Sequence, residues 1–62
     1  MHVSVIIPAL NEEAGIAQAL ERAWSAGAGE VIVVDGGSRD RTVDICKQAR
    51  CRWIQRPPGR AV

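Results

Sequence analysis

The chain has 62 residues, a formal net charge of +1, two cysteines and one histidine. A chain of this length forms one small domain, which buries only about 60% of the surface that its unfolded form exposes. So few cysteines and histidines exclude a structural zinc site, which takes about four such ligands, and without a visible signal peptide they also argue against a secreted disulfide framework. No apolar run approaches the ~20 residues of a membrane helix, and the composition predicts a cytoplasmic protein.

Three short segments have the composition of β-strands. Val3–Ile7 and Glu30–Val34 are rich in β-branched residues, which is typical of strands buried on both faces of a parallel sheet. Pro8 has no backbone N–H to donate to a ladder, so we expect it to end the first strand. A third strand is predicted over Cys51–Gln55.

Two helices are predicted between these strands. Asn11 is the expected N-cap of the first, which runs to about Ser25 because apolar side chains recur there at helical spacing. The second spans roughly Arg41–Arg50, with Ser38 or Asp40 as its cap. The order β-α-β-α-β predicts an α/β fold with a parallel sheet and right-handed crossovers. Three strands and two helices would leave apolar surface uncovered, which indicates further chain or an oligomer.

Polar loops follow the first two strands, at residues 8–12 and 35–40. Ligands of open α/β sheets bind outside the carboxyl ends of the strands, so we expect the two loops to lie side by side on one rim. Asp35 either accepts hydrogen bonds from a base or a ribose, or caps its own turn. Asn11 and Glu12 have an equally good explanation as the start of a helix.

The charges are unevenly distributed, because only basic residues follow Asp44. Such a tail suits phosphate or nucleic acid, or it forms a solvated surface. Arginine binds diphosphates bidentately, and the candidates for that role are Arg39, Arg41, Arg56 and Arg60, of which Arg60 is the best placed because it follows Gly59 in a loop. The segment holds no catalytic constellation, since His2 lies at the terminus and no pair of carboxylates stands out.

At the two loops the sequence resembles a known family. Val3–Glu13, with its Pro-x-x-Asn-Glu motif, is similar to the opening of family 2 glycosyltransferases of the GT-A fold. Val31–Thr42 resembles the second conserved stretch of that family, and Arg56–Ala61 resembles the lead-in to a third. The resemblance implies that residues 1–62 are the N-terminal fragment of a GT-A (Rossmann-like) nucleotide-binding domain, which ends before the metal motif.

The resemblance also implies a function. The full-length enzyme is expected to transfer a sugar from a nucleoside diphosphate donor, most simply a uridine diphosphate sugar, with a divalent metal (Mg or Mn) whose ligands are not in this chain. The fragment alone is expected to be inactive, and the full-length protein to be cytoplasmic or peripheral at the inner membrane face. By resemblance the nucleotide-binding residues are Pro8, Ala9, Asn11, Glu12, Asp35 and Arg60.

Other classes of protein stay open at this point. The chain also fits a non-catalytic nucleotide-binding module, or an interaction unit that self-associates through an exposed sheet edge. A role in binding RNA is disfavoured, because RNA platforms use aromatic stacking residues and the chain has only Trp24 and Trp53. We therefore expect no nucleic-acid partner.

Overall fold

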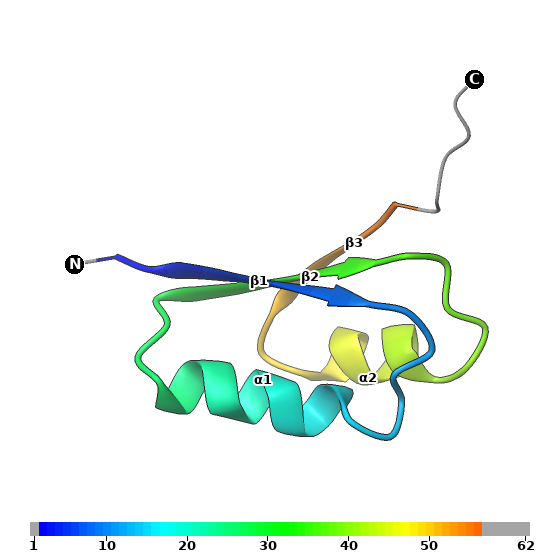
Figure 1. Cartoon of the computed structure of the whole chain (residues 1–62), viewed down its shortest axis with the longest axis horizontal. Coiled ribbons are helices and arrows are strands. Elements are labelled where there is room, and N and C mark those ends of the chain that lie inside the picture. Colours follow the sequence, from blue (N-terminus) through cyan, green and yellow to red (C-terminus); the bar gives the residue numbers. More distant parts are fainter. Residues whose placement is uncertain (1, 57–62) are drawn as a thin grey trace.

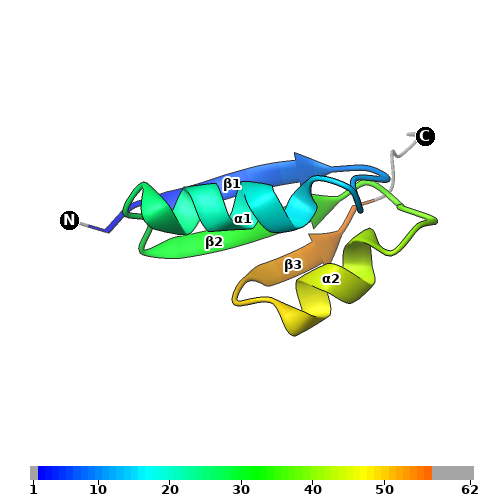
Figure 2. The same ribbon diagram turned by 90° about the horizontal axis from the view of Figure 1, so that it is seen from below.

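The computed structural model describes residues 2–56. Its three strands are parallel and lie in the order β1-β2-β3, which confirms the predicted α/β fold. Both helices cover the same face of the sheet (Figure 1), with α1 over β1 and β2, and α2 beside β3 (Figure 2). In chain order the elements are β1 (Ser4–Ala9), α1 (Ile16–Ser25), β2 (Glu30–Asp35), α2 (Thr42–Gln48) and β3 (Arg52–Gln55).

The prediction that Pro8 ends the first strand is wrong, because β1 continues to Ala9 and Pro8 pairs with Val34. The carbonyl of Ala9 accepts the N–H of Gly36 at 2.8 Å, so the backbone polar groups of Ala9 face β2. The backbone nitrogen and carbonyl of Pro8 point the other way, toward the open edge of the described sheet. A proline is tolerated there because no ladder bond needs its missing N–H.

The first helix begins later than predicted, and Asn11 is not its N-cap. The carbonyl of Glu12 accepts the N–H groups of Gly15 and Ile16, at 2.9 and 2.8 Å, and this turn leads into α1 at Ile16. Asn11 lies before the turn with a φ of 51°, a left-handed conformation that asparagine tolerates better than most residues. The predicted start of the first helix is therefore about one turn too early.

The second helix is shorter than predicted at both ends, because it spans Thr42–Gln48. Its N-cap residue is Arg41, and not Ser38 or Asp40 as predicted. Asp40 still contributes at this end, because its Oδ1 accepts the N–H of Thr42 at 2.9 Å. Ala49 is extended, with a ψ of 166°, and ends the helix. The third strand then runs over Arg52–Gln55, one residue shorter than predicted.

The core lies between the helices and one face of the sheet. Ile16 of α1 is 1% exposed and Val33 of β2 is fully buried. The opposite face of the sheet carries no helix in the described chain (Figure 1), and there Ile6 is 63% exposed and Ile54 is 47% exposed. The expectation of uncovered apolar surface is thus confirmed.

Candidate functional site

Two connections meet at the carboxyl ends of the strands: loop 1 (residues 10–15), which follows β1, and loop 2 (residues 36–41), which follows β2. Three successive backbone N–H groups of loop 1 donate to side chains of loop 2 or of the first residue of α2. The pairs are Asn11 N to Ser38 Oγ at 2.8 Å, Glu12 N to Thr42 Oγ1 at 2.8 Å and Glu13 N to Asp40 Oδ2 at 3.1 Å.

The loops are also joined in the opposite direction. Oδ1 of Asn11 accepts the N–H of Arg39 at 2.8 Å, and Oε1 of Glu13 accepts the N–H of Arg41 at 2.9 Å. Each loop thus satisfies backbone groups of the other, which confirms that the two lie side by side. The side chains of Asn11 and Glu13 therefore connect the two loops of the rim.

Asp35 is the buried acid of the rim, with 1% of its surface exposed. Its Oδ2 accepts the N–H groups of Gly37 and Ser38 at 3.0 and 2.9 Å and Nε2 of Gln55 at 3.3 Å, while Oδ1 accepts the Ser38 hydroxyl. Burial opposes ionisation, but the hydrogen bonds from Ser38, Gly37 and Gln55 outweigh it and hold the pKa of Asp35 below its ordinary value. Gly37 has a φ of 104°, which the turn around this carboxylate requires.

A hollow of about 460 Å³ opens at the same rim. Its walls are mostly apolar or small, and its charged members are one acid from loop 1 and one base that follows β3. The lining residues are Pro8, Ala9, Leu10, Glu12, Val34, Gly36 and Arg56.

Two charged side chains, those of Glu12 and Arg56, line this hollow. Within residues 2–56, neither the carboxylate of Glu12 nor the guanidinium of Arg56 makes a hydrogen bond or an ion pair with another side chain. The backbone of Arg56 is nevertheless fixed, because its N–H donates to the carbonyl of Asp35 at 2.7 Å. Such a site offers a hydrogen-bond acceptor and a cation beside an apolar wall, each carried on a backbone position that is fixed by a hydrogen bond.

The residues predicted to bind nucleotide therefore divide into groups. Pro8, Ala9 and Glu12 line the hollow. Asn11 and Asp35 do not line it and belong to the hydrogen-bonded network of the two loops. Arg60 lies outside the described residues.

Sequence reasoning passed over part of the lining. Leu10 and Val34 line the hollow without having been assigned a role, and their only signal was their position at the strand ends. Gly36, which was expected to let a ligand approach the backbone closely, also lines it. Arg56 was one of four candidate arginines for a diphosphate, and the structure places it in the hollow.

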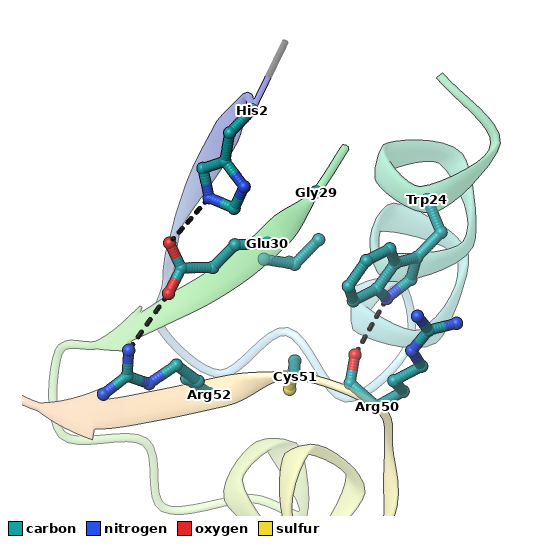
Figure 3. Close-up of a pocket in the computed structure, with 8 residues that line it drawn as sticks. His2, Trp24, Gly29, Glu30, Arg50, Cys51 and Arg52 are labelled. Atoms are coloured by element: carbon teal, nitrogen blue, oxygen red, sulfur yellow. Dashed lines mark hydrogen bonds and ion pairs between the residues drawn. The ribbon is translucent and has the colours of Figure 1, made fainter. Parts of the chain in front are cut away.

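A second hollow, of about 370 Å³, lies at the opposite, amino-terminal end of β2 and β3 (Figure 3). Its charged groups already have partners: Oε2 of Glu30 lies 3.0 Å from the guanidinium of Arg52, and its Oε1 lies 3.6 Å from Nε2 of His2. The guanidinium of Arg50 lies over the ring of Trp24, 4.3 Å from its centre. Nε1 of Trp24 donates to the carbonyl of Arg50 at 2.8 Å, as Figure 3 shows. We therefore assign the candidate site to the carboxyl-terminal rim, where Glu12 and Arg56 have no side-chain partner within residues 2–56.

Residues 2–56 do not contain a set of ligands for the divalent metal that the resemblance implies. Among residues 2–56, no three His, Cys, Asp or Glu side chains come together in a way that could hold a metal ion. None of the helices in that range is long and apolar enough to cross a membrane.

Comparison with known proteins identifies the family. The chain belongs to glycosyl transferase family 2, whose sequence model matches residues 4–61. This confirms the resemblance noted in the sequence, and the parallel sheet with its helices corresponds to the N-terminal, Rossmann-like part of a GT-A domain. No solved structure matches the chain significantly.

Curated relatives carry the comparison further. An undecaprenyl-phosphate 4-deoxy-4-formamido-L-arabinose transferase of Pseudomonas aeruginosa is 42% identical over 52 residues, which cover 76% of this chain and 15% of that protein. The enzyme of the same name from Edwardsiella ictaluri is 37% identical over 65 residues, covering 97% and 19%. An uncharacterized protein of Methanocaldococcus jannaschii is 39% identical over 55 residues, covering 84% and 23%. The chain thus spans less than a quarter of the length of these relatives.

Proposed function

We propose that the protein is a glycosyltransferase that uses a nucleoside-diphosphate sugar, and that the rim formed by loops 1 and 2 binds the nucleoside. The observation that carries the proposal is the hollow at the carboxyl ends of the strands, whose carboxylate, that of Glu12, has no partner among the described side chains. Membership of the family supports sugar transfer. The position supports a ligand site, because open α/β sheets bind ligands at this end.

The described residues have different roles in the proposed binding of the nucleoside. The carboxylate of Glu12 accepts hydrogen bonds from ribose hydroxyls or from a base N–H, and Pro8 and Ala9 supply the adjoining wall. Asn11 and Asp35 act on the nucleoside by fixing the loops that surround it. Uracil is the base that we propose, and Arg60 is a further proposed contact to the base or the diphosphate.

The chemistry of transfer is proposed for parts of the protein beyond these residues. A divalent metal, Mg or Mn, would offset the charge of the diphosphate as the sugar leaves, and we propose that its ligands lie elsewhere in the full-length enzyme. The names of two relatives specify undecaprenyl phosphate, a membrane lipid. A lipid acceptor of that kind would place the full-length protein at the inner face of the membrane.

Titration of the full-length protein with uridine diphosphate, in the presence of Mg²⁺, tests the proposed site. We expect Glu12→Gln to weaken binding by about tenfold, since a hydrogen bond to a charged group contributes about 1.5–3 kcal/mol. Glu21→Gln is the matched control, because Glu21 is an exposed acid of α1 that does not line the hollow. Equal affinities in the two variants would refute the assignment of the site.

Transfer itself needs a separate assay, in which a labelled uridine diphosphate sugar is followed with polyprenyl phosphate as the acceptor. Product formation is the expected result. Tight binding of uridine diphosphate without any turnover of the donor would instead favour a non-catalytic nucleotide-binding module.

A further inference from the structure

We infer that Glu12 and Arg56 fix the direction in which the nucleotide lies, with the nucleoside at Glu12 and the diphosphate at Arg56. The inference rests on the proposed function, because it concerns the same hollow. What it adds is the role of Arg56, whose positive charge determines how the donor is oriented.

The position of Arg56 is set by the sheet. Its N–H donates to the carbonyl of Asp35 at 2.7 Å, which extends the pairing of β2 and β3 by one residue beyond Gln55. The side chain therefore starts from a fixed point on the rim and borders the hollow. An arginine held in this way loses less freedom on binding a ligand than one in an unpaired loop would.

The other described bases after Asp44 already have partners within the chain. This distinguishes Arg56, whose guanidinium is exposed and makes no such contact within residues 2–56. The engaged bases are Lys47, which lies 5.8 Å from the ring of Trp53, Arg50, which lies 4.3 Å from the ring of Trp24, and Arg52, which lies 3.0 Å from Glu30.

The acids of the rim show the same contrast. The carboxylates of Glu13, Asp35 and Asp40 accept backbone N–H groups of the two loops, so they are already hydrogen-bonded within the fold. Glu12 is the rim acid whose carboxylate has no such bond among the described residues, and it lines the hollow with Arg56. The hollow therefore has one negative and one positive group to offer a ligand.

A nucleoside diphosphate has the matching polarity. Ribose hydroxyls and base N–H groups are donors, which a carboxylate accepts. The diphosphate is anionic, so Glu12 repels it while the guanidinium of Arg56 binds its oxygens bidentately. The reverse orientation would put the diphosphate against the acid and leave the arginine with the uncharged nucleoside.

The test measures the affinity of the full-length protein for uridine and for uridine diphosphate, and compares the wild type with Arg56→Gln. We expect this change to weaken the binding of uridine diphosphate about tenfold or more and to leave the affinity for uridine within about twofold of that of the wild type. Arg56→Lys should retain part of the preference, because lysine keeps the charge but loses the bidentate geometry. The control is Arg41→Gln, an exposed arginine of loop 2 that does not line the hollow.

Each outcome either supports or overturns the role inferred for Arg56. Loss of affinity for uridine diphosphate alone supports the inference. Equal losses for both ligands would place Arg56 at the nucleoside, and no loss for either would remove it from the site, so both results overturn the inference while leaving the proposed function in place. Wild-type protein that binds neither ligand would refute the proposed function, and this inference with it.

Discussion

The backbone N–H of Glu12 donates to Oγ1 of Thr42 at 2.8 Å, across 30 residues of sequence. Thr42 is fully buried and begins α2, so the acid that lines the hollow is held in place by the start of the second helix. The hydroxyl of Thr42 also donates to Oδ1 of Asp40. The shape of the candidate site therefore depends on both loops together, and neither loop alone defines it.

Replacing Thr42 by valine should destabilise the protein by about 2 kcal/mol, because it leaves the N–H of Glu12 without its acceptor. Thr42→Ser is the matched control, since it keeps the hydroxyl and loses only a methyl group. Urea unfolding of the two variants measures the difference. Equal loss of stability in both variants would mean that packing, and not the hydrogen bond, makes the contribution of Thr42.

Two substitutions of Asn11 separate its hydrogen bond from its backbone conformation. Both Asn11→Gly and Asn11→Ala remove the acceptor for the N–H of Arg39. Alanine must also adopt a φ of 51°, which costs a non-glycine residue about 1–2 kcal/mol. We expect the alanine variant to be the less stable of the two by about 1 kcal/mol in thermal unfolding. A glycine variant that is no more stable than the alanine variant would contradict the strain assigned to this position.

Asp35 should make stability depend on pH in the acid range. Its hydrogen bonds hold the pKa of the folded state below the unfolded value of about 3.9. The stabilisation is therefore fully present above that unfolded value and is lost as the pH falls through the lower, folded pKa. Asp35→Asn should be about 2 kcal/mol less stable near neutral pH, because its amide cannot accept all of these bonds. A difference between wild type and variant that stays constant down to about pH 2 would contradict this account.

The two thiols should differ in reactivity. Burial, with Cys51 nearby, raises the pKa of Cys46 to about 11, and Cys46 is only 2% exposed. Cys51 is half-buried, and burial raises its pKa as well. With iodoacetamide near neutral pH we expect Cys51 to be modified before Cys46, and both more slowly than free cysteine. Mass spectrometry of the digested protein identifies the order, and earlier modification of Cys46 would contradict its burial between α2 and the sheet.

The sequence predicted the elements of this fold well because the signals for them are local. The β-branched runs of β1 and β2 and the apolar face of α1 each lie within a few consecutive residues. The start of α1 was misplaced because an asparagine followed by two acidic residues is typical of a helix N-terminus. Here the side chains of Asn11 and Glu13 instead accept backbone N–H groups of loop 2. That choice is made by contacts across the sheet, which no local pattern records.

The candidate site shows the same limit. Its place at the strand ends followed from the parallel order of the elements, and Glu12 followed from the family motif. That Asp35 caps its own turn was one of the two alternatives open from the sequence, and the structure bears it out. Its further hydrogen bond from Gln55 of β3 could not be foreseen, because that residue lies 20 positions away along the chain. Arg56 was singled out only once its neighbouring bases were seen to have partners within the chain.

Nucleotide that binds at the rim of loops 1 and 2 should slow the exchange of backbone amides there. Hydrogen–deuterium exchange of the full-length protein, with and without uridine diphosphate, measures this effect. We predict slower exchange in peptides that cover residues 8–12 and 35–38, and no change around Glu30 and Arg52 at the opposite end of the sheet. Protection confined to the end that holds Glu30 and Arg52, with none at the rim, would contradict the account.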